Sequence, residues 1–194
     1  DDSWWTNLRE DLPALDARTP VIVALDAATS NDSFGMAVVS RHPARRADVA
    51  IRYAREWKPP KGGLIRFGTK AEPETPRGFL EYLINTHNVV QVVADPYQLH
   101  AMLTELRDDG RVYAKSFDQG RDRLEADAQF RQLVINRRVA HDGNAALAEH
   151  VKNANIAVDA QSRKLRIVKR ESSLKIDLAV CASMACYAAL GIDM

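Results

Sequence analysis

Three aspartates, each next to an apolar segment, are the residues of this chain best suited to chemistry. Asp26 follows the apolar run 21–25, Asp95 follows the run 89–94, and Asp177 heads a long apolar stretch. A carboxylate at the tip of a buried strand is costly unless a cation meets it there. Hard divalent cations such as Mg²⁺ prefer oxygen ligands, so converging carboxylates can hold them. The three aspartates therefore indicate a metal-dependent cleavage of a phosphodiester bond.

Each aspartate can be given a role in such a site. Two-metal cleavage needs cations about 3.5–4 Å apart, one to activate water and one to stabilise the leaving oxygen. We expect Asp26 to bridge both cations from the first central strand. Asp95, at the end of a neighbouring strand, would complete the ligands of one cation, and Asp177, approaching from a helix, those of the other.

Other acidic and histidine residues fit structural roles better. Asp32 lies in a polar turn, where aspartate usually bonds to its own backbone. Glu125 and Asp127 are expected on the solvent-facing side of a polar helix. His141 and His150 are not spaced as a chelating pair on one helix, so we predict that neither binds a metal.

The formal net charge of +1 hides a local asymmetry. Residues 1–20 are acidic, whereas residues 40–70 and 163–175 are rich in lysine and arginine. Basic segments near acidic strand ends suit a polyanion held by its phosphates, although each could also be a solvated face. From the second segment we predict DNA contacts for Lys169, Arg170 and Lys175, with Lys175 near the scissile phosphate.

Composition and length fit one globular domain: 194 residues, of which 46% are hydrophobic and 27% charged. Cys181 and Cys186 are five residues apart in one apolar segment, so we expect free, buried thiols rather than a zinc site. The sequence contains neither a nucleotide-binding P-loop motif nor a signal-peptide pattern nor an apolar run long enough to span a membrane. We expect a cytosolic protein that is not secreted.

Periodicity predicts strands followed by alternating helices and strands. The expected strands are 21–26, 34–40, 49–57, 89–94 and 111–116, with a polar-tipped hairpin formed by 156–158 and 165–168. The expected helices follow Pro76 and Pro96 and span about 122–137, 144–153 and 174–190. The strand 89–94 is apolar on both faces, which is typical of a central parallel strand. This order is the outline of an RNase H-like α/β domain, a central mixed β-sheet flanked by α-helices.

Three segments resemble a known family. Residues 24–29, 93–97 and 175–185 look like the C-terminal nuclease domain of tailed-bacteriophage terminase large subunits, and the likeness extends over about residues 20–190. The closing Lys175-Ile176-Asp177 with its alanine-rich helix is its most specific part. A match also runs from Phe130 through the histidine-containing turn to the helix that ends in Asn153-Ala154.

The resemblance implies an RNase H-like endonuclease that cuts concatemeric viral DNA during genome packaging and uses two Mg²⁺ or Mn²⁺ ions. Carried over residue by residue, it gives Asp26, Asp95 and Asp177 as the metal-binding acids. It further implies double-stranded DNA as substrate, the host cytoplasm as location, and as partners the portal and the small terminase subunit. The family's N-terminal ATPase motor is not in this sequence, which starts without methionine; we expect residues 1–20 to be a connecting segment and 21–194 the nuclease domain.

Three alternatives remain at this point. Another RNase H-like nuclease, such as a junction resolvase or a transposase core, would share the acids but add a fourth carboxylate near the last helix. A catalytically silent DNA-binding module would show no metal affinity. A small-molecule α/β enzyme is disfavoured, because no glycine-rich cofactor loop follows the first strand.

Overall fold

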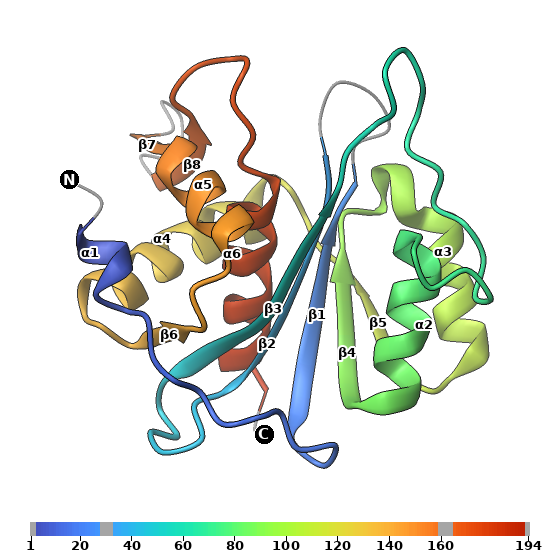
Figure 1. Cartoon of the computed structure of the whole chain (residues 1–194), viewed down its shortest axis with the longest axis horizontal. Coiled ribbons are helices and arrows are strands. Elements are labelled where there is room, and N and C mark those ends of the chain that lie inside the picture. Colours follow the sequence, from blue (N-terminus) through green and yellow to red (C-terminus); the bar gives the residue numbers. More distant parts are fainter. Residues whose placement is uncertain (1–2, 28–32, 159–164, 193–194) are drawn as a thin grey trace.

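A mixed β-sheet with helices on both faces forms the centre of the domain. The computed structural model describes residues 3–27, 33–158 and 165–192. The sheet has six strands in the order β5-β4-β1-β2-β3-β6 (Figure 1). Their bounds are β1 Pro20–Asp26, β2 Phe34–Arg41, β3 Val49–Trp57, β4 Asn88–Ala94, β5 Tyr113–Ser116 and β6 Val139–His141. β1, β2 and β3 form an antiparallel meander, and β4 runs parallel to β1, so the predicted mixed sheet is confirmed.

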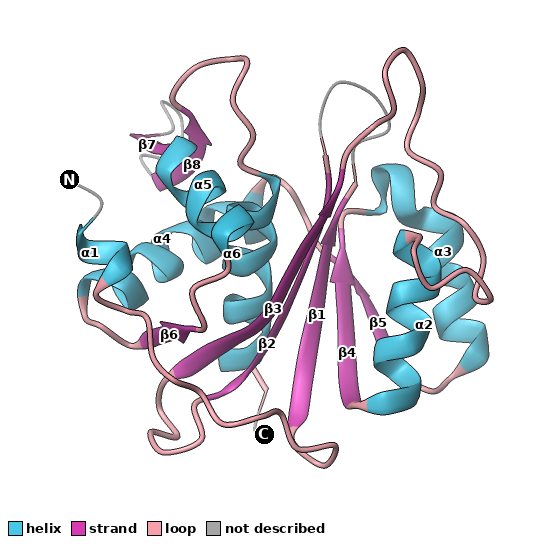
Figure 2. Cartoon of the chain, viewed as in Figure 1, coloured by secondary structure: helices cyan, strands magenta, loops and turns pink. Residues whose placement is uncertain are grey.

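The helices divide between the two faces of the sheet (Figure 2). α2 Pro76–Thr86 and α3 Pro96–Asp109 cover one face. α4 Arg121–Ile135, α5 Ala145–Asn153 and α6 Asp177–Leu190 cover the other, together with the short α1 Ser3–Thr6 and the separate hairpin of β7 Ala154–Val158 and β8 Leu165–Lys169. Within the described part of the chain, no helix is long and apolar enough to cross a membrane.

The central strand β1 contributes to both hydrophobic cores. Successive side chains of a strand point to opposite faces. Accordingly Val21, Val23 and Leu25 join the core under α2 and α3, while Ile22 and Ala24 join the core under α6. The strand is therefore apolar throughout, and its first polar position is at its end, at Asp26.

α6 is buried on nearly every side, because it packs between the sheet and two helices. It contacts β1, β2 and β3 on one side and α4 and α5 on the other. Its alanines allow the close approach, and both cysteines are free and buried as predicted. Burial raises the pKa of both thiols, so they are neutral packing groups at physiological pH.

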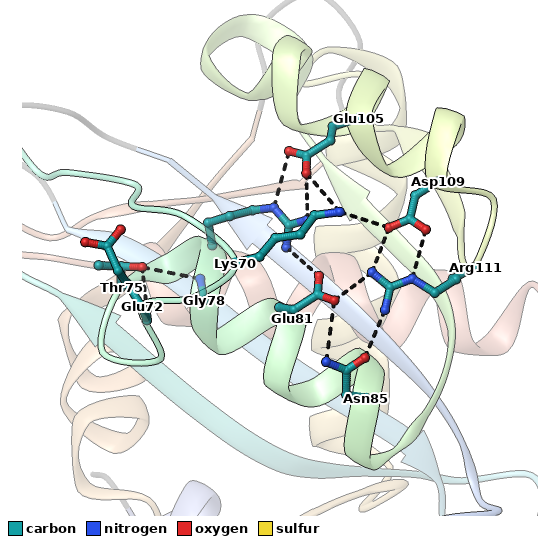
Figure 3. A network of polar contacts seen from close by, with 10 residues as sticks. Lys70, Glu72, Thr75, Gly78, Glu81, Asn85, Glu105, Asp109 and Arg111 are labelled. Carbon is teal, nitrogen blue, oxygen red and sulfur yellow. Dashed lines mark hydrogen bonds and ion pairs between the residues drawn. The ribbon is translucent and has the colours of Figure 1, made fainter.

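A cluster of ion pairs joins the helices of the opposite face. Arg77 of α2 is 3% exposed and pairs with Glu81 at 3.1 Å and with Glu105 of α3 at 3.0 Å. Figure 3 shows Glu105 and Asp109 of α3 directed toward Lys70, and Glu81, Asn85 and Asp109 gathered around Arg111. Hydrogen bonds from Arg111 and Lys70 lower the pKa of Asp109, and a hydrogen bond from Arg77 lowers that of Glu105. The cluster fixes α3, the helix that begins directly after Asp95.

Most predicted elements are present with small shifts at their ends. The last helix begins at Asp177 rather than 174, and the strand predicted over 111–116 begins at Tyr113. β6 was not predicted; it is an edge strand of three residues that pairs with β3, so it is too short to show a period. Asp32, Arg163 and Lys164 lie outside the described residues.

The prediction that Asp127 faces solvent is wrong. Its side chain is 1% exposed and accepts hydrogen bonds from Arg123 at 2.9 Å, from Ser183 of α6 at 2.8 Å and from the backbone N–H of Ile167 in β8 at 2.9 Å. Glu125 is half-buried and accepts from the Tyr187 hydroxyl at 2.9 Å. A helix of low overall hydrophobicity thus buries a charge on the side that meets α6 and the hairpin.

Most basic residues of the segment 40–70 have partners within the protein, several of them in ion pairs at the surface. Arg45 pairs with Glu10 and Asp48, Lys58 with Glu56, and Arg66 with Glu72. Two other arginines take neutral partners: Arg52 donates to the Pro13 carbonyl, and Arg55 stacks on the rings of Trp57 and Phe79. The basic character of this segment in the sequence therefore overstates the positive charge that it offers to a ligand.

The N-terminal segment packs on the domain through Trp5. Trp5 is buried and stacks on His141 with ring centroids 4.3 Å apart, whereas Trp4 is 47% exposed. The Nδ1 atom of His141 accepts from the N–H of Gly143, so its Nε2–H donates to the Trp5 carbonyl oxygen. A backbone bridge between Arg9 and His141 extends this contact.

Candidate active site

The three candidate aspartates lie at one edge of the sheet. Asp26 is the last residue of β1 and Asp95 directly follows β4, the parallel neighbour of β1 in which Ala94 pairs with Leu25. Asp177 is the first residue of α6, whose N-terminal end lies at the same edge (Figure 1). Carboxyl ends of parallel strands meet at one side of a sheet and commonly carry functional groups there. Tertiary structure thus brings together residues that are up to 151 positions apart in the chain.

Gly35 lets the start of α6 approach β1 and β2 closely. It is the β2 partner of Asp26, and a Cβ atom on it would lie 3.2 Å from the backbone carbon and oxygen of Asp177 and 3.0 Å from Cys181 Sγ. Such distances are too short for an ordinary contact, so the absence of a side chain permits this packing. The backbone of Asp177 consequently lies directly beside the position opposite Asp26.

The carboxylates of Asp26 and Asp177 both lie near the buried thiol of Cys181. Burial raises the pKa of this thiol, and the negative charges of Asp26 and Asp177 raise it further. Asp26 is half-buried, whereas Asp177 is 7% exposed and accepts a hydrogen bond from the N–H of Ser33 at 3.3 Å. Two carboxylates share this neighbourhood, where their mutual repulsion favours a bound cation.

Asp95 has a second task as the N-cap of α3. Its Oδ1 accepts from the N–H of Tyr97 at 2.9 Å, and Pro96 occupies the first helical turn. Among residues 3–27, 33–158 and 165–192, no three His, Cys, Asp or Glu side chains are grouped closely enough to hold a metal ion. A cation held by all three aspartates would thus require their carboxylates to turn from these positions.

Two side chains of α5 hold the entry to α6. The Nδ1 atom of His150 accepts from the N–H of Leu178 at 3.0 Å, and Asn153 donates to the Lys175 carbonyl oxygen at 3.1 Å. Both bonds flank Asp177 in the chain. They satisfy backbone groups at a helix N-terminus that has no side-chain cap of its own.

His150 is oriented in turn by Glu56 of β3. Because Nδ1 accepts a hydrogen bond, the ring proton is on Nε2, which donates to Glu56 Oε2 at 3.2 Å. Ser33 and Lys58 also contact the Glu56 carboxylate, at 3.1 and 3.0 Å. Burial raises the pKa of Glu56, but the hydrogen bonds from Lys58 and Ser33 and the nearby His150 outweigh it, so the net shift is downward.

Sequence reasoning missed this set of supporting residues. The sequence pattern predicts Glu56 only as part of the strand 49–57 and His150 as a residue that binds no metal; in the structure His150 holds the start of a helix. His150 and Asn153 are three positions apart and so share one face of α5, which is the signal that could have suggested a role at a buried helix end.

The three basic residues predicted to contact DNA lie in two different places, one next to Asp177 and two at the β7–β8 hairpin. Lys175 lies two residues before it at the sheet edge, half-buried. Lys169 ends β8, and Arg170 follows it, with its Nε donating to the Ala154 carbonyl oxygen at 3.0 Å. The segment 170–176 arches from the hairpin to the start of α6 (Figure 1). The structure thus places Lys175 beside the candidate site and the other two at the base of the hairpin.

Comparison with known proteins gives a relative from a bacteriophage. The Gene 13 protein of Mycobacterium phage D29 is 28% identical over 206 aligned residues, which cover 95% of this chain and 31% of the relative. The chain therefore spans about a third of the length of the curated relative that it matches.

Solved structures share the fold at low sequence identity. The large terminase of bacteriophage HK97 has a TM-score of 0.78 at 16% identity, over 97% of this chain and 43% of the other. The large terminase nuclease of the thermophilic phage G20c with bound magnesium has a TM-score of 0.64 at 15% identity, over 94% and 93%. A human cytomegalovirus terminase nuclease domain, soaked with Mn, has a TM-score of 0.57 at 16% identity, over 96% and 91%. These likenesses confirm the predicted RNase H-like arrangement of sheet and helices.

A sequence model of one protein family matches residues 73–191, more than half of the chain. Its description is terminase large subunit, endonuclease domain. The matched stretch includes Asp95 and Asp177 and ends just after α6. The resemblance seen in the sequence is thereby confirmed, and the chain belongs to the terminase large subunit endonuclease domain family.

Proposed function

We propose that this domain is a metal-dependent DNA endonuclease that cuts concatemeric viral DNA during genome packaging. The observation that supports the proposal is that Asp26, Asp95 and Asp177 follow or begin elements that end at the same side of the sheet, two parallel strands and a helix start. Family membership supplies the reaction class. It also favours a terminase nuclease over the resolvase and transposase alternatives.

The donor set fits a hard divalent cation. All three side chains offer carboxylate oxygens, which Mg²⁺ and Mn²⁺ favour, and two of them lie close enough to one buried thiol to influence its pKa. Related nucleases have been solved with magnesium, with cobalt and after a manganese soak. When bound, two such ions would activate a water molecule and stabilise the leaving oxygen of the phosphodiester. Asp26, Asp95 and Asp177 would be the residues that hold these ions.

The remaining residues position the carboxylates and the substrate. His150 and Asn153 hold the backbone on both sides of Asp177, so its carboxylate is presented from a fixed helix start. Lys175 would meet the scissile phosphate, and Lys169 and Arg170 would hold flanking phosphates of double-stranded DNA. A longer protein of this family would add the ATPase motor and the contacts to portal and small terminase subunit, in the host cytoplasm.

A plasmid-cleavage assay tests the proposal. The purified domain is incubated with supercoiled plasmid in Mn²⁺, in Mg²⁺ and in EDTA, beside Asp26→Asn and a matched control, Asp108→Asn, at an exposed position of α3. We expect nicking and linearisation that require metal, vanish in Asp26→Asn and persist in Asp108→Asn. Cleavage that survives Asp26→Asn would refute the assigned site.

A catalytically silent DNA-binding module is the second candidate. The observation in its favour is that the described carboxylates are not yet grouped around a common point. It predicts DNA binding that depends on salt through phosphate contacts alone. Calorimetric titration of Mn²⁺ into the domain separates the two: heat of binding that Asp26→Asn removes supports the nuclease, and no binding by folded protein supports the silent module.

A further inference from the structure

A groove beside α4 contains none of the three candidate aspartates, and of the residues assigned to DNA it includes only Arg170. It has a volume of about 590 Å³ and lies between α1, α4, the end of α5 and the β7–β8 hairpin. Its floor and walls are mostly apolar, with Phe130, Val134 and Ile135 from α4 and Val151, Ile156 and Ile167 from the other elements. A cavity of this size can take several bulky side chains.

Apolar side chains at its rim are open to solvent. Trp4 is 47%, Ile135 53% and Ile156 43% exposed, and all three line the groove. Single exposed apolar residues are ordinary, but a set that surrounds one hollow marks an interaction site. Tryptophan at the edge of an apolar hollow is also a common energetic anchor of protein interfaces.

All charged side chains among the described residues that line the groove are positive. Arg131, Arg137 and Arg170 line it, and none of the described lining residues is acidic. Elsewhere arginines of this chain pair with carboxylates, as Arg45, Arg77 and Arg111 do. Within the described ranges, by contrast, the three groove arginines form no ion pair.

We propose that this groove docks a partner protein through an acidic amphipathic helix, whose apolar side chains enter the hollow while its carboxylates meet Arg131 and Arg137. Apolar anchors at positions i, i+3, i+4 and i+7 of a helix match such a groove, and complementary charge at the rim speeds association and selects the partner. Nucleic acid fits less well, because phosphates gain nothing from aliphatic walls such as Val134 and Ile167. The groove contains none of the three aspartates, and Arg131 and Arg137 are not among the residues assigned to DNA, so the inference does not depend on catalysis.

A binding assay with a designed probe tests the inference. The probe is a fluorescein-labelled helical peptide of about 18 residues, with Leu and Phe at the four anchor positions and Glu on the other faces. A second peptide carries Lys in place of every Glu, and a third has the first composition in scrambled order. Fluorescence anisotropy measures binding to the native domain, to Arg131→Glu/Arg137→Glu, to Ile135→Ser and to the matched control Arg121→Glu, on the same helix α4 but outside the groove.

We expect the acidic peptide to bind the native domain and Arg121→Glu alike. The double arginine variant should bind it at least about tenfold more weakly, and Ile135→Ser should also weaken it. Circular dichroism confirms that each variant is folded, and Ile135→Ser, which leaves the charges unchanged, separates a lost apolar contact from a lost charge. Equal binding of the lysine or scrambled peptide would overturn the proposal.

Two further outcomes would assign the groove to another occupant. Loss of affinity for a short DNA duplex in Arg131→Glu/Arg137→Glu, with no peptide binding by the native domain, would assign it to nucleic acid. Concentration-dependent dimerisation in sedimentation experiments, abolished by Ile135→Ser, would assign it to a second copy of this chain. Either result overturns the proposed partner helix.

Discussion

At the scale of single residues, the candidate site combines three carboxylates with a set of hydrogen bonds that fix one of them. Asp177 follows a loop that carries no cap for α6, and His150 and Asn153 of α5 supply the missing backbone partners. Glu56 orients His150. The position of one catalytic candidate thus depends on side chains that come from two other elements.

Replacing Asp26 by Asn should leave the fold intact and make the metal-free protein slightly more stable. The change removes one charge from a pair of neighbouring carboxylates and so relieves their repulsion. In EDTA we expect a thermal midpoint equal to or above that of the native domain. Added Mn²⁺ should raise the midpoint of the native domain, because an ion that binds the folded state stabilises it. It should not raise the midpoint of Asp26→Asn, which lacks one of the proposed ligands. A variant that is unfolded in EDTA would show that Asp26 is structural.

Replacing His150 should impair cleavage without abolishing DNA binding. His150→Phe keeps the ring volume but removes the acceptor for the Leu178 N–H, whereas an asparagine side chain can place its oxygen near the position of Nδ1. We expect cleavage rates to fall about tenfold or more in His150→Phe and less in His150→Asn. DNA affinity in EDTA, measured by anisotropy, should be unchanged in both.

His100→Phe, at an exposed position of α3, is the matched control for that series. Equal losses in His150→Phe and His150→Asn, with equal losses of stability, would mean that His150 acts only through packing.

At the scale of elements, a buried polar junction connects α4, α6 and the β7–β8 hairpin. Asp127 accepts from Arg123, from Ser183 and from the Ile167 N–H, while Arg123 also donates to the Ile167 carbonyl oxygen at 3.3 Å. The hairpin is a separate two-stranded sheet, and an isolated hairpin has little stability of its own. Together with the burial of Ile167 in the core, the junction attaches the hairpin, and with it Lys169 and Arg170, to the domain.

Asp127→Ala should lower the free energy of unfolding by about 3–5 kcal/mol, since it leaves the buried Arg123 guanidinium without its charge partner. Replacing both partners, in Arg123→Met/Asp127→Leu, should cost less than Asp127→Ala alone, because no unpaired charge remains buried. Urea denaturation measures both variants. A double variant that is less stable than Asp127→Ala would show that the hydrogen bonds to Ser183 and Ile167 outweigh the ion pair.

At the scale of the whole molecule, the N-terminal segment is tied to the sheet through His141. Its ring stacks on Trp5, donates to the Trp5 carbonyl and accepts from Gly143, so it fits as a neutral imidazole. Burial is the main cause that lowers the pKa of His141 below its ordinary value of 6.5. Docking of residues 3–9 on the domain is thus linked to the protonation of one ring.

This linkage predicts a loss of stability on mild acidification. Because the pKa of His141 is lower in the folded state, its contribution is fully present above the unfolded value of 6.5 and is lost as the pH falls through the folded value. We expect the unfolding free energy of the native domain to decrease between about pH 7 and pH 5. His141→Gln should flatten this dependence, as measured by urea denaturation at each pH. An unchanged slope in the variant would assign the dependence to other groups.

Much of the architecture was open to prediction from the sequence. Period-two and period-3.6 patterns are local properties, so strands such as 49–57 and helices such as the one opened by Pro96 were found nearly at their true bounds. Element ends were less accurate, because the residues before Asp177 are held by partners from α5 rather than by a local cap. β6 escaped prediction since its pairing with β3 comes from contacts distant in sequence.

By itself the sequence determined the strand-end aspartates, the mixed α/β order and the family. An apolar run that predicts a buried strand and the aspartate that follows it are adjacent in the chain, so both can be recognised locally. Only the tertiary structure decided that Asp127 is buried, that most of the basic segment 40–70 is paired internally, and that His150 and Glu56 support α6. It also decided that an apolar groove lined by three arginines forms beside α4. Each of these depends on which side chains from distant positions meet, and charge or polarity along the chain does not reveal the partner.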